Sequence, residues 1–485
     1  MTTQFDKEEP LAGEVDEFDR ELGSPASSAV SVDDEEKRNI SLADGNSDGE
    51  GDLSDVSHQS EVSEVGSAHT KAGYIRENTN IYKSAFHIFK ANVGTGVFLL
   101  PTFYKDSGYV MGVVLGVFIG ACVIDASIML LNAKLMINRP RVDTYSKICG
   151  FVFGHPLQWV LFVALILTQF GFCLMYVQFV AGMMDAMVPA FSGSSYVWML
   201  ITFVIVFPIT CFSDNLSLLA IASIFATVAV TFALVTTLAR SIIEIHTRGG
   251  INPSTNVTGV NIPIGWFNNL ANNMMVLEGI AILLPVHAGC NQKNKFKPMF
   301  GMVLICVVAF YLLYGIVGYL AYGDHLTNSL IDGMPDDGLS IAIRIAFIIN
   351  LICTHPVQFQ SAIQLIDQLV GCRSRSVKGI LIRLALNAAI TGLAMGIGAD
   401  TVNIVVSFIG ALPATVMVLI LPALLNLQVF YAVKNPDEDR VTLAYWIKIF
   451  TAGPVCSWLR FRCYLYLLLG VLIMGIGTYS IVINL

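Results

Sequence analysis

The feature that most constrains this chain is a succession of apolar segments, each long enough to cross a lipid bilayer. An α-helix needs about twenty apolar residues to span the hydrocarbon core. Eleven such segments follow one another in the 485-residue sequence: 81–103, 109–136, 157–188, 196–212, 216–241, 264–288, 299–322, 338–370, 379–399, 402–431 and 461–483. The sequence therefore predicts an all-α polytopic membrane protein with about eleven transmembrane helices.

Charge divides the chain into two parts. Residues 1–66 hold 19 of the 36 acidic residues and only four Lys or Arg. This part therefore has a net charge of −15, whereas the whole chain has a net charge of −8. The segment is also poor in aromatic residues, and such a composition buries too little apolar surface to offset the entropy of ordering. We predict that residues 1–78 are a disordered acidic cytoplasmic tail and that residues 79–485 are the transmembrane domain. Serines beside acids in the tail make a kinase or signalling partner a further expectation.

The distribution of basic residues predicts the orientation. With the N-terminus cytoplasmic, the inside loops hold fifteen Lys or Arg and the opposite side holds three, as the positive-inside rule requires. An odd number of spans then places the C-terminus on the lumenal or extracellular side. The segment "NPSTNVTG" falls on that side and contains an Asn-Val-Thr sequon, which predicts glycosylation of Asn256.

Two of the apolar segments are interrupted near their middle. Gly94-Thr95-Gly96 interrupts the first segment, and Glu278-Gly279 interrupts the sixth. Glycine weakens a helix interior, and a membrane helix opens its backbone only where protein, water or a ligand satisfies the freed groups. Interruptions at matching positions in two five-helix halves point to a transporter site at the interface of an inverted repeat. Close helix packing through small residues is the alternative reading for either glycine cluster alone.

Several of these segments together resemble one transporter family. The segment "HIFKANVGTGVFLLP" resembles the first transmembrane segment of the proton-coupled and vacuolar amino acid transporters of the amino acid/auxin permease family. "QFGFCLMYVQFV", "LEGIAILLP", "CTHPVQF" and "SFIGALPATVMVLILPAL" resemble that family's third, sixth, eighth and tenth segments. The resemblance implies a leucine-transporter-like fold, a 5+5 inverted repeat with helices 1 and 6 broken, followed by an eleventh helix.

The resemblance also implies the function. Residues 79–485 are then an amino acid transporter domain in the lipid bilayer, and we expect secondary active symport of small neutral amino acids with protons. Sodium coupling, as in a sister branch of the family, is an alternative. An amino acid sensor (transceptor) that signals through the tail is another. By resemblance alone, the vacuolar or lysosomal membrane is favoured over the plasma membrane.

The expected substrate site combines the two interruptions with one residue of the third span. Backbone N–H groups at the start of a half-helix attract the carboxylate of an amino acid, and carbonyls freed at the second interruption attract its ammonium group. The residues expected to contact the substrate are Gly94, Thr95, Gly96, Leu277, Glu278, Gly279 and Tyr176. For Tyr176, ordinary helix packing is the alternative role.

Ionisable residues inside a membrane are expensive, so they are candidates for ion coupling. Glu278 is the first candidate proton site, with a structural hydrogen bond across the helix break as the alternative. The resemblance places the family's first-segment histidine, which is implicated in proton coupling, at His87. Asp125, near the centre of the second span, needs a partner or a proton and ranks below Glu278. Asn92 and Thr354 are candidate oxygen ligands for sodium.

The sequence favours no chemistry beyond transport. It has no HExxH or P-loop motif, so we do not expect an enzyme. The ten cysteines contain no CxxC pair, which predicts neither a structural metal site nor a disulfide framework. We therefore expect no cofactor other than the coupling ion, H⁺ or Na⁺, and no nucleic acid partner.

Overall fold

The computed structural model describes residues 79–139, 142–188, 195–214, 216–259, 263–372, 375–398, 401–434, 443–451 and 458–484. All of them belong to one compact unit, Ser63–Leu485. The predicted tail of residues 1–78 lies outside the described residues, and so does any partner expected for it.

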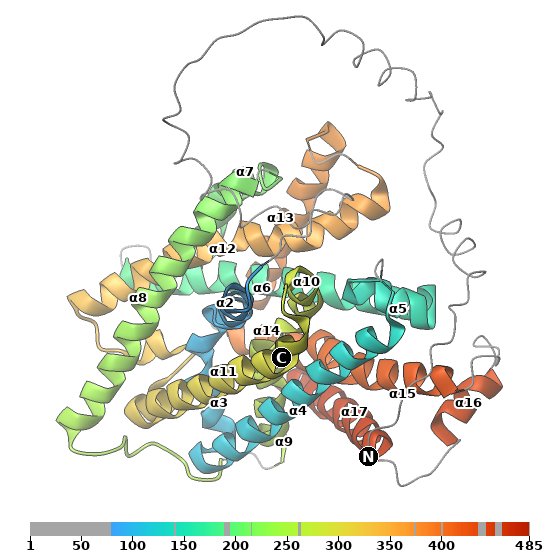
Figure 1. Ribbon diagram of the computed structural model, residues 1–485. Helices are drawn as coiled ribbons and strands as arrows, with labels where there is room; N and C mark the ends of the chain where they lie inside the picture. Colours follow the sequence, from blue (N-terminus) through green and yellow to red (C-terminus); the bar gives the residue numbers. More distant parts are fainter. Residues whose placement is uncertain are drawn as a thin grey trace, which may run out of the picture. The chain divides into compact units, whose positions relative to one another are not determined.

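The described residues are almost entirely helical (Figure 1). The first half consists of α2 (Ile81–Asn92), the 3₁₀ helix η3 (Thr95–Leu99), α3 (Leu100–Ser107), α4 (Tyr109–Ile137), α5 (Tyr145–Phe153), α6 (His155–Met187), α7 (Ser195–Cys211) and α8 (Leu216–Arg248). The second half begins with α9 (Ile264–Val276), the 3₁₀ helix η5 (Gly279–Ile282), α10 (Leu283–Gly289), α11 (Lys293–Tyr322), η6 (Gly323–His325), η7 (Leu330–Gly333), α12 (Gly338–Val370) and α13 (Val377–Ile397). It ends with α14 (Val402–Ile409), the π-helical segments η9 (Gly410–Ala414) and η10 (Val416–Ile420), α15 (Leu421–Lys434), α16 (Leu443–Thr451) and α17 (Trp458–Asn484).

Each predicted span corresponds to a helix or to a broken helix. Within the described ranges, nine helices are long and apolar enough to cross a membrane, α7 is a shorter apolar helix, and the first span is α2–η3–α3. The prediction of an all-α polytopic membrane protein is confirmed. Two short helices, α5 and α16, were not predicted because nine residues are too few for a span.

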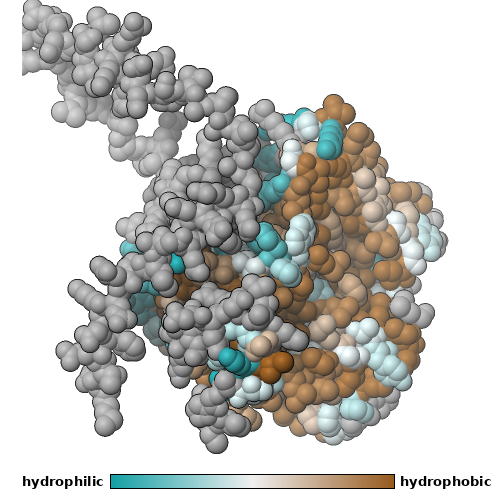
Figure 2. Space-filling model, turned by 90° about the vertical axis from the view of Figure 1, so that its right-hand side faces the viewer, coloured by the Kyte–Doolittle hydropathy of each residue, from teal (hydrophilic) through white to brown (hydrophobic). Residues whose placement is uncertain are grey.

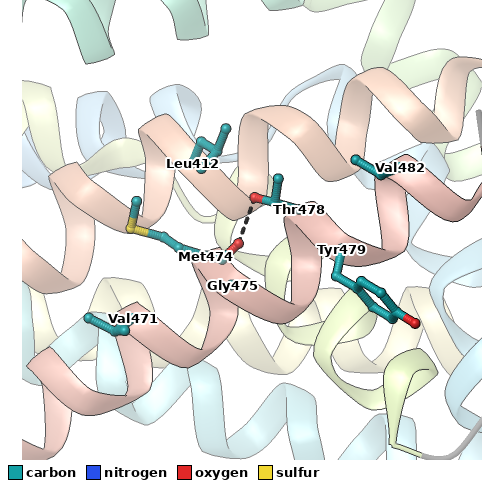
Figure 3. A pocket seen from close by; sticks show the side chains of 7 residues that line it. All are labelled: Leu412, Val471, Met474, Gly475, Thr478, Tyr479 and Val482. Carbon is teal, nitrogen blue, oxygen red and sulfur yellow. Dashed lines mark hydrogen bonds between the residues drawn. The ribbon is translucent and has the colours of Figure 1, made fainter.

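The outer surface is apolar over the helices, as expected of a surface in contact with lipid. Figure 2 shows a mostly hydrophobic face. On α8, the side chains of Phe225, Val228 and Val235 are each more than 60% exposed. An open apolar groove of about 580 Å³ runs along α17 (Figure 3), lined by Leu412, Val471, Met474, Gly475, Thr478, Tyr479 and Val482.

Small residues set the closest helix contacts, because lipid provides no hydrophobic force that drives helices together. Gly112, Gly116 and Gly120 form a stripe with one residue per turn on α4. Cβ atoms at these positions would meet side chains of α3 and α11, namely Tyr104, Leu312 and Val308. This stripe brings α4 against α3, the second half of the interrupted first span, and against α11.

The tenth span contains a wide turn beside α9. Pro413 lacks an N–H, which disrupts the regular hydrogen-bond pattern, and η9 and η10 have π-helical geometry here. Gly410 lies directly against the backbone carbonyl of Ala271 on α9, and a Cβ at this position would overlap it. Gly410 therefore permits the close approach of the tenth span to the broken sixth span.

Replacement of Gly410 is expected to push these two spans apart. Gly410→Ala should lower the midpoint of thermal unfolding of the detergent-purified protein by several degrees, because overpacking against backbone costs about 1–3 kcal/mol. Gly475→Ala is the matched control, since nothing lies within 4 Å of a Cβ there. The control should leave the midpoint unchanged or raise it slightly. Equal midpoints for the two variants would contradict this account of Gly410.

The segment between α11 and α12 is anchored to several helices. Lys105 Nζ of α3 donates to the carbonyl of Leu326 at 2.7 Å, and Asn403 Nδ2 of α14 donates to the carbonyl of Thr327 at 3.2 Å. Asp337, the N-cap of α12, pairs with Arg240 of α8 at 2.5 Å. These contacts hold one end of the bundle together, and the sequence-based prediction that this end is lumenal or extracellular stays a prediction.

The Arg240–Asp337 pair is expected to withstand acidification. The Arg240 guanidinium, followed by the Ser340 N–H, lowers the pKa of the Asp337 carboxyl from its ordinary value. A lowered folded-state pKa gives stability that is present above the unfolded value, about 3.9, and is lost as the pH falls below it. The difference in thermal midpoint between wild type and Asp337→Asn should therefore be constant from pH 7 to pH 5 and shrink only below about pH 4. A difference already lost at pH 5 would contradict this expectation.

Candidate functional site

The first helix break lies between α2 and η3. The backbone of Val93 (φ −85°, ψ 99°) and of Gly94 (φ −140°, ψ −156°) is extended, so α2 stops at Asn92. The first hydrogen bond of the new turn runs from the N–H of Val97 to the carbonyl of Gly94 at 3.3 Å. The N–H groups of Gly94, Thr95 and Gly96 precede this bond and are the free donors of a helix start.

The second break lies between α9 and η5. The α9 ladder ends with a bond from the N–H of Leu277 to the carbonyl of Asn273 at 3.0 Å. Glu278 (φ −76°, ψ 17°) then leads into η5, and regular α-helix resumes only at Leu283. Both interruptions predicted from the sequence are therefore present as breaks in helices 1 and 6.

The two breaks lie side by side. A Cβ at Gly279 would overlap the side-chain amide of Asn92, and a Cβ at Gly96 would lie 3.3 Å from Cγ1 of Val276. The structure therefore brings Asn92 and Gly96 of the first break against Val276 and Gly279 of the second. The absence of a side chain at the two glycines makes this approach possible.

Two buried acceptors at the breaks have no hydrogen-bond partner among the described residues. Asn92 is 7% exposed, and its Nδ2 donates to the carbonyl of Ile88 at 2.8 Å, whereas its Oδ1 is unpartnered. Oε2 of Glu278 is also buried and unpartnered. Because buried polar atoms are nearly always hydrogen-bonded, two free acceptors mark a place suited to a proton, a cation or an N–H donor.

Tyr176 of α6 contacts the first break. Its hydroxyl accepts a hydrogen bond from the hydroxyl of Thr95 at 3.2 Å, and Gln358 of α12 is a second hydrogen-bonding neighbour. Tyr176 is 3% exposed. The predicted wall residue is thus joined to the unwound segment, while contact with a substrate stays a prediction.

The other candidates for ion coupling lie on α2 and α12. His87 is half-buried on α2, two turns before the break, with its ring edge-on to Phe86. The hydroxyl of Thr354 donates to Oδ1 of Asn350 on the same helix at 3.2 Å. No hydrogen bond joins Thr354 to Asn92 in the described part of the chain, and the proton and sodium roles stay predictions.

The carboxylate of Asp125 pairs with two side chains of α17. Its Oδ1 pairs with Arg462 of α17 at 2.6 Å, and its Oδ2 accepts from the hydroxyl of Tyr466 at 2.7 Å. This pairing explains how an acid is tolerated in a membrane helix, since buried charges are paired. It ties α4 to α17, and a role of Asp125 in proton coupling stays a prediction.

Asn256 lies in the loop between α8 and α9. Its Nδ2 donates to Asp324 at 3.4 Å, and its backbone N–H donates to the hydroxyl of Tyr319 at 3.1 Å. The side chain is half-buried. Glycosylation of this sequon stays a prediction.

The sequence analysis missed a polar stripe on α9. Asn269 Nδ2 donates to the carbonyl of Phe103 at 2.9 Å, and Asn272 Oδ1 accepts from the hydroxyl of Ser407 on α14 at 3.0 Å. These residues connect the helix before the second break to α3 and to the tenth span. The available signal was four asparagines, 268, 269, 272 and 273, at helical spacing in a membrane segment.

The sequence analysis also missed Tyr311 of α11. Its hydroxyl donates to the carbonyl of Asn92 and, at 3.5 Å, contacts the carbonyl of Val276. The apolar span holds four tyrosines, 311, 314, 319 and 322, and nothing in the sequence singles out Tyr311 as the one that makes such a contact.

Two apolar cavities in the described part of the chain lie away from the breaks. Besides the groove on α17, an apolar cavity of about 280 Å³ lies among α7, α8 and α12, lined by Pro208, Ile209, Phe212, Leu218, Leu219, Ile221, Ala222, Ile352 and Cys353. Neither is lined by residues of the two breaks.

The Thr95–Tyr176 bond is expected to show as coupling between the two positions. Thr95→Val, Tyr176→Phe and the double variant form a double-mutant cycle on the free energy of unfolding. Each variant removes one hydroxyl, so we expect a coupling of about 1 kcal/mol, the net worth of one buried hydrogen bond. Purely additive losses would contradict a direct bond between these hydroxyls.

Comparison with known proteins shows which family the chain matches. The family described as "Transmembrane amino acid transporter protein" matches residues 77–480. Amino acid transporter AVT3A of Arabidopsis thaliana is 24% identical over 371 residues, which cover 72% of this chain and 81% of that protein. Vacuolar amino acid transporter 3 of Schizosaccharomyces pombe is 21% identical over 359 residues, which cover 72% of this chain and 53% of that protein.

A solved structure shows the same fold. The inward-facing conformation of Mhp1 aligns with a TM-score of 0.54 at 11% identity, and the match covers 83% of this chain and 91% of that one. The predicted leucine-transporter-like architecture with broken helices 1 and 6 is thereby confirmed. With the family match over most of its length, the chain belongs to the transmembrane amino acid transporter protein family, and it is a multi-pass membrane transporter of amino acids, not an enzyme.

Proposed function

We propose that this transporter carries small neutral amino acids together with protons across the vacuolar or lysosomal membrane, from the lumen to the cytosol, with its N-terminus in the cytosol. The observation that carries the proposal is the meeting of two broken helices at Glu278, whose buried Oε2 has no partner among the described residues. The names of relatives such as vacuolar amino acid transporter 3 support the choice of membrane.

The two breaks offer complementary groups for a zwitterion. The N–H groups of Gly94, Thr95 and Gly96 stand at the start of a half-helix, where unpaired donors and the helix dipole favour a carboxylate. The α9 half-helix ends at Val276, where the backbone carbonyls freed at the second break favour an ammonium group. An amino acid would therefore lie across the two breaks with its charged groups at opposite ends.

The crowding at the breaks favours a small side chain. The Cβ position of Gly96 is already 3.3 Å from Val276, and the Thr95–Tyr176 hydrogen bond closes the side toward α6. A phenylalanine-sized substrate would have to displace these groups farther than alanine or serine would.

Glu278 is the proposed proton carrier. In an apolar interior an unpaired carboxylate is unfavourable, so the side chain binds a proton from an acidic lumen. His87, on the half-helix that leads toward the predicted cytoplasmic side, is the proposed second proton-binding residue, because an imidazole nitrogen can accept and donate a proton.

The coupling ion can be tested in proteoliposomes. Purified protein is reconstituted, and uptake of labelled L-alanine, L-serine, L-leucine, L-glutamate and L-arginine is driven either by a pH gradient or by a sodium gradient. We expect accumulation of alanine and serine with the pH gradient alone. Accumulation driven by sodium at equal pH would overturn proton coupling and would favour Asn92 and Thr354 as sodium ligands.

Glu278→Gln tests the proposed carrier directly. The amide keeps the shape of the side chain but cannot bind and release a proton, so uptake driven by the pH gradient should fall about tenfold or more. Glu244→Gln is the control, because Glu244 pairs with Arg248 near the end of α8, at 2.7 Å. Uptake by the control variant should stay within about twofold of wild-type uptake. Equal pH-driven uptake by Glu278→Gln and wild type would contradict the proposed role of Glu278 as the proton carrier.

A further inference from the structure

Tyr311 of α11 connects the two helix breaks through a single hydroxyl group. The side chain is 3% exposed. Its hydroxyl donates to the carbonyl of Asn92, the last residue of α2, and it lies 3.5 Å from the carbonyl of Val276, the last residue of α9. The contacted carbonyls thus occupy equivalent positions in the two halves of the repeat.

The chemistry of a helix end makes this contact informative. The last carbonyls of a helix have no partner within the helix, and the membrane interior supplies no water in their place. A tyrosine hydroxyl has one proton to donate. It can fully satisfy only one carbonyl, and the 3.5 Å contact with Val276 is the weaker of the two. The Val276 carbonyl therefore keeps acceptor capacity at the second break.

The contact with Asn92 also orients a side chain. Tyr311 fixes the main-chain carbonyl of Asn92, and Nδ2 of Asn92 is held by the carbonyl of Ile88 at 2.8 Å. With these two groups fixed, Oδ1 of Asn92 is directed at Gly279 and has no partner among the described residues. One hydroxyl thereby sets both the distance between the breaks and the direction of a free acceptor.

We propose that Tyr311 is a positioning residue, which sets the separation of the two breaks and through it the affinity for the transported amino acid. This inference rests on the proposed function, in which an amino acid bridges the breaks. Without the hydroxyl, the carbonyl of Asn92 loses its donor, and α2 is free to shift relative to α9. The substrate would then have to restore the spacing on binding, which lowers affinity more than it lowers turnover.

Tyr311→Phe removes the hydroxyl and retains the ring. The chain offers a matched control in Tyr314→Phe. Tyr314 lies on the same helix and is fully buried, and its hydroxyl shares a 2.7 Å hydrogen bond with Thr237 of α8. Its ring, which phenylalanine retains, packs edge-on to Phe98 of η3. Both variants therefore lose one buried hydroxyl from α11, and only one of them loses a contact with the breaks.

The experiment measures initial rates of uptake into proteoliposomes with labelled L-alanine and L-serine, across a fixed pH gradient. Tyr311→Phe should raise KM about fivefold or more, the effect of one lost hydrogen bond, with the maximal rate within about twofold of wild type. Tyr314→Phe should leave KM unchanged. An unchanged KM in Tyr311→Phe, or equal increases in both variants, would overturn the proposal.

A second substitution covers the case in which Tyr311→Phe does not fold. Incorporation of 3,5-difluorotyrosine at position 311 retains the ring and hydroxyl and makes the hydroxyl a stronger donor. KM should then fall about twofold or more, and the same replacement at position 314 should not change it. Equal KM values for wild type and the difluorotyrosine protein would overturn the inference. If wild type itself takes up neither amino acid, the proposed function fails first.

Discussion

The structure depends on the rule that every backbone N–H and C=O inside a bilayer needs a partner within the protein. Most of the chain meets this rule with continuous helices. The first and sixth spans do not, because α2 stops at Asn92 and α9 stops at Val276. The surrounding helices compensate for these interruptions, and Tyr311 of α11 supplies a hydroxyl to the carbonyls at both ends.

Two layers of side chains surround the first break. At the level of the break, the hydroxyls of Thr95 and Tyr176 are joined by a hydrogen bond. One helical turn farther along η3, the ring of Phe98 packs on Phe347 of α12, with ring centroids 4.7 Å apart, and Phe179 of α6 packs on the same Phe347. A polar layer therefore faces the free N–H groups, and an aromatic layer separates them from the end of the bundle that Lys105 and Asn403 hold together.

Local composition was sufficient to predict the spans and the breaks. Runs of apolar residues predicted the spans, and Gly96 and Gly279 marked the breaks. A Cβ at Gly279 would overlap Asn92, and a Cβ at Gly96 would make a tight contact with Val276. The carboxylate of Glu278 could likewise be placed at the second break from its position beside Gly279.

The remaining features depend on contacts between residues distant in sequence. Arg462, the partner of Asp125, lies 337 residues away, and the Tyr311 hydroxyl reaches a carbonyl 219 residues away. The sequence around Tyr311 reads as an ordinary apolar span, so only packing reveals which way its hydroxyl points. The close contact of Gly410 with the α9 backbone was missed for a similar reason, although Pro413 in the same π-helical segment is visible in the sequence.

The half-helix α2 precedes the first break, and the half-helix α10 follows the second. A short parallel β-bridge joins the start of α2 to the end of α10. The N–H of Thr79 donates to the carbonyl of Gly289 at 2.9 Å, and the N–H of Asn291 donates to the carbonyl of Thr79 at 3.1 Å. These hydrogen bonds tie the start of the first span to the end of the sixth, beyond the two breaks. A shift of either half-helix therefore has to move the other or break this bridge.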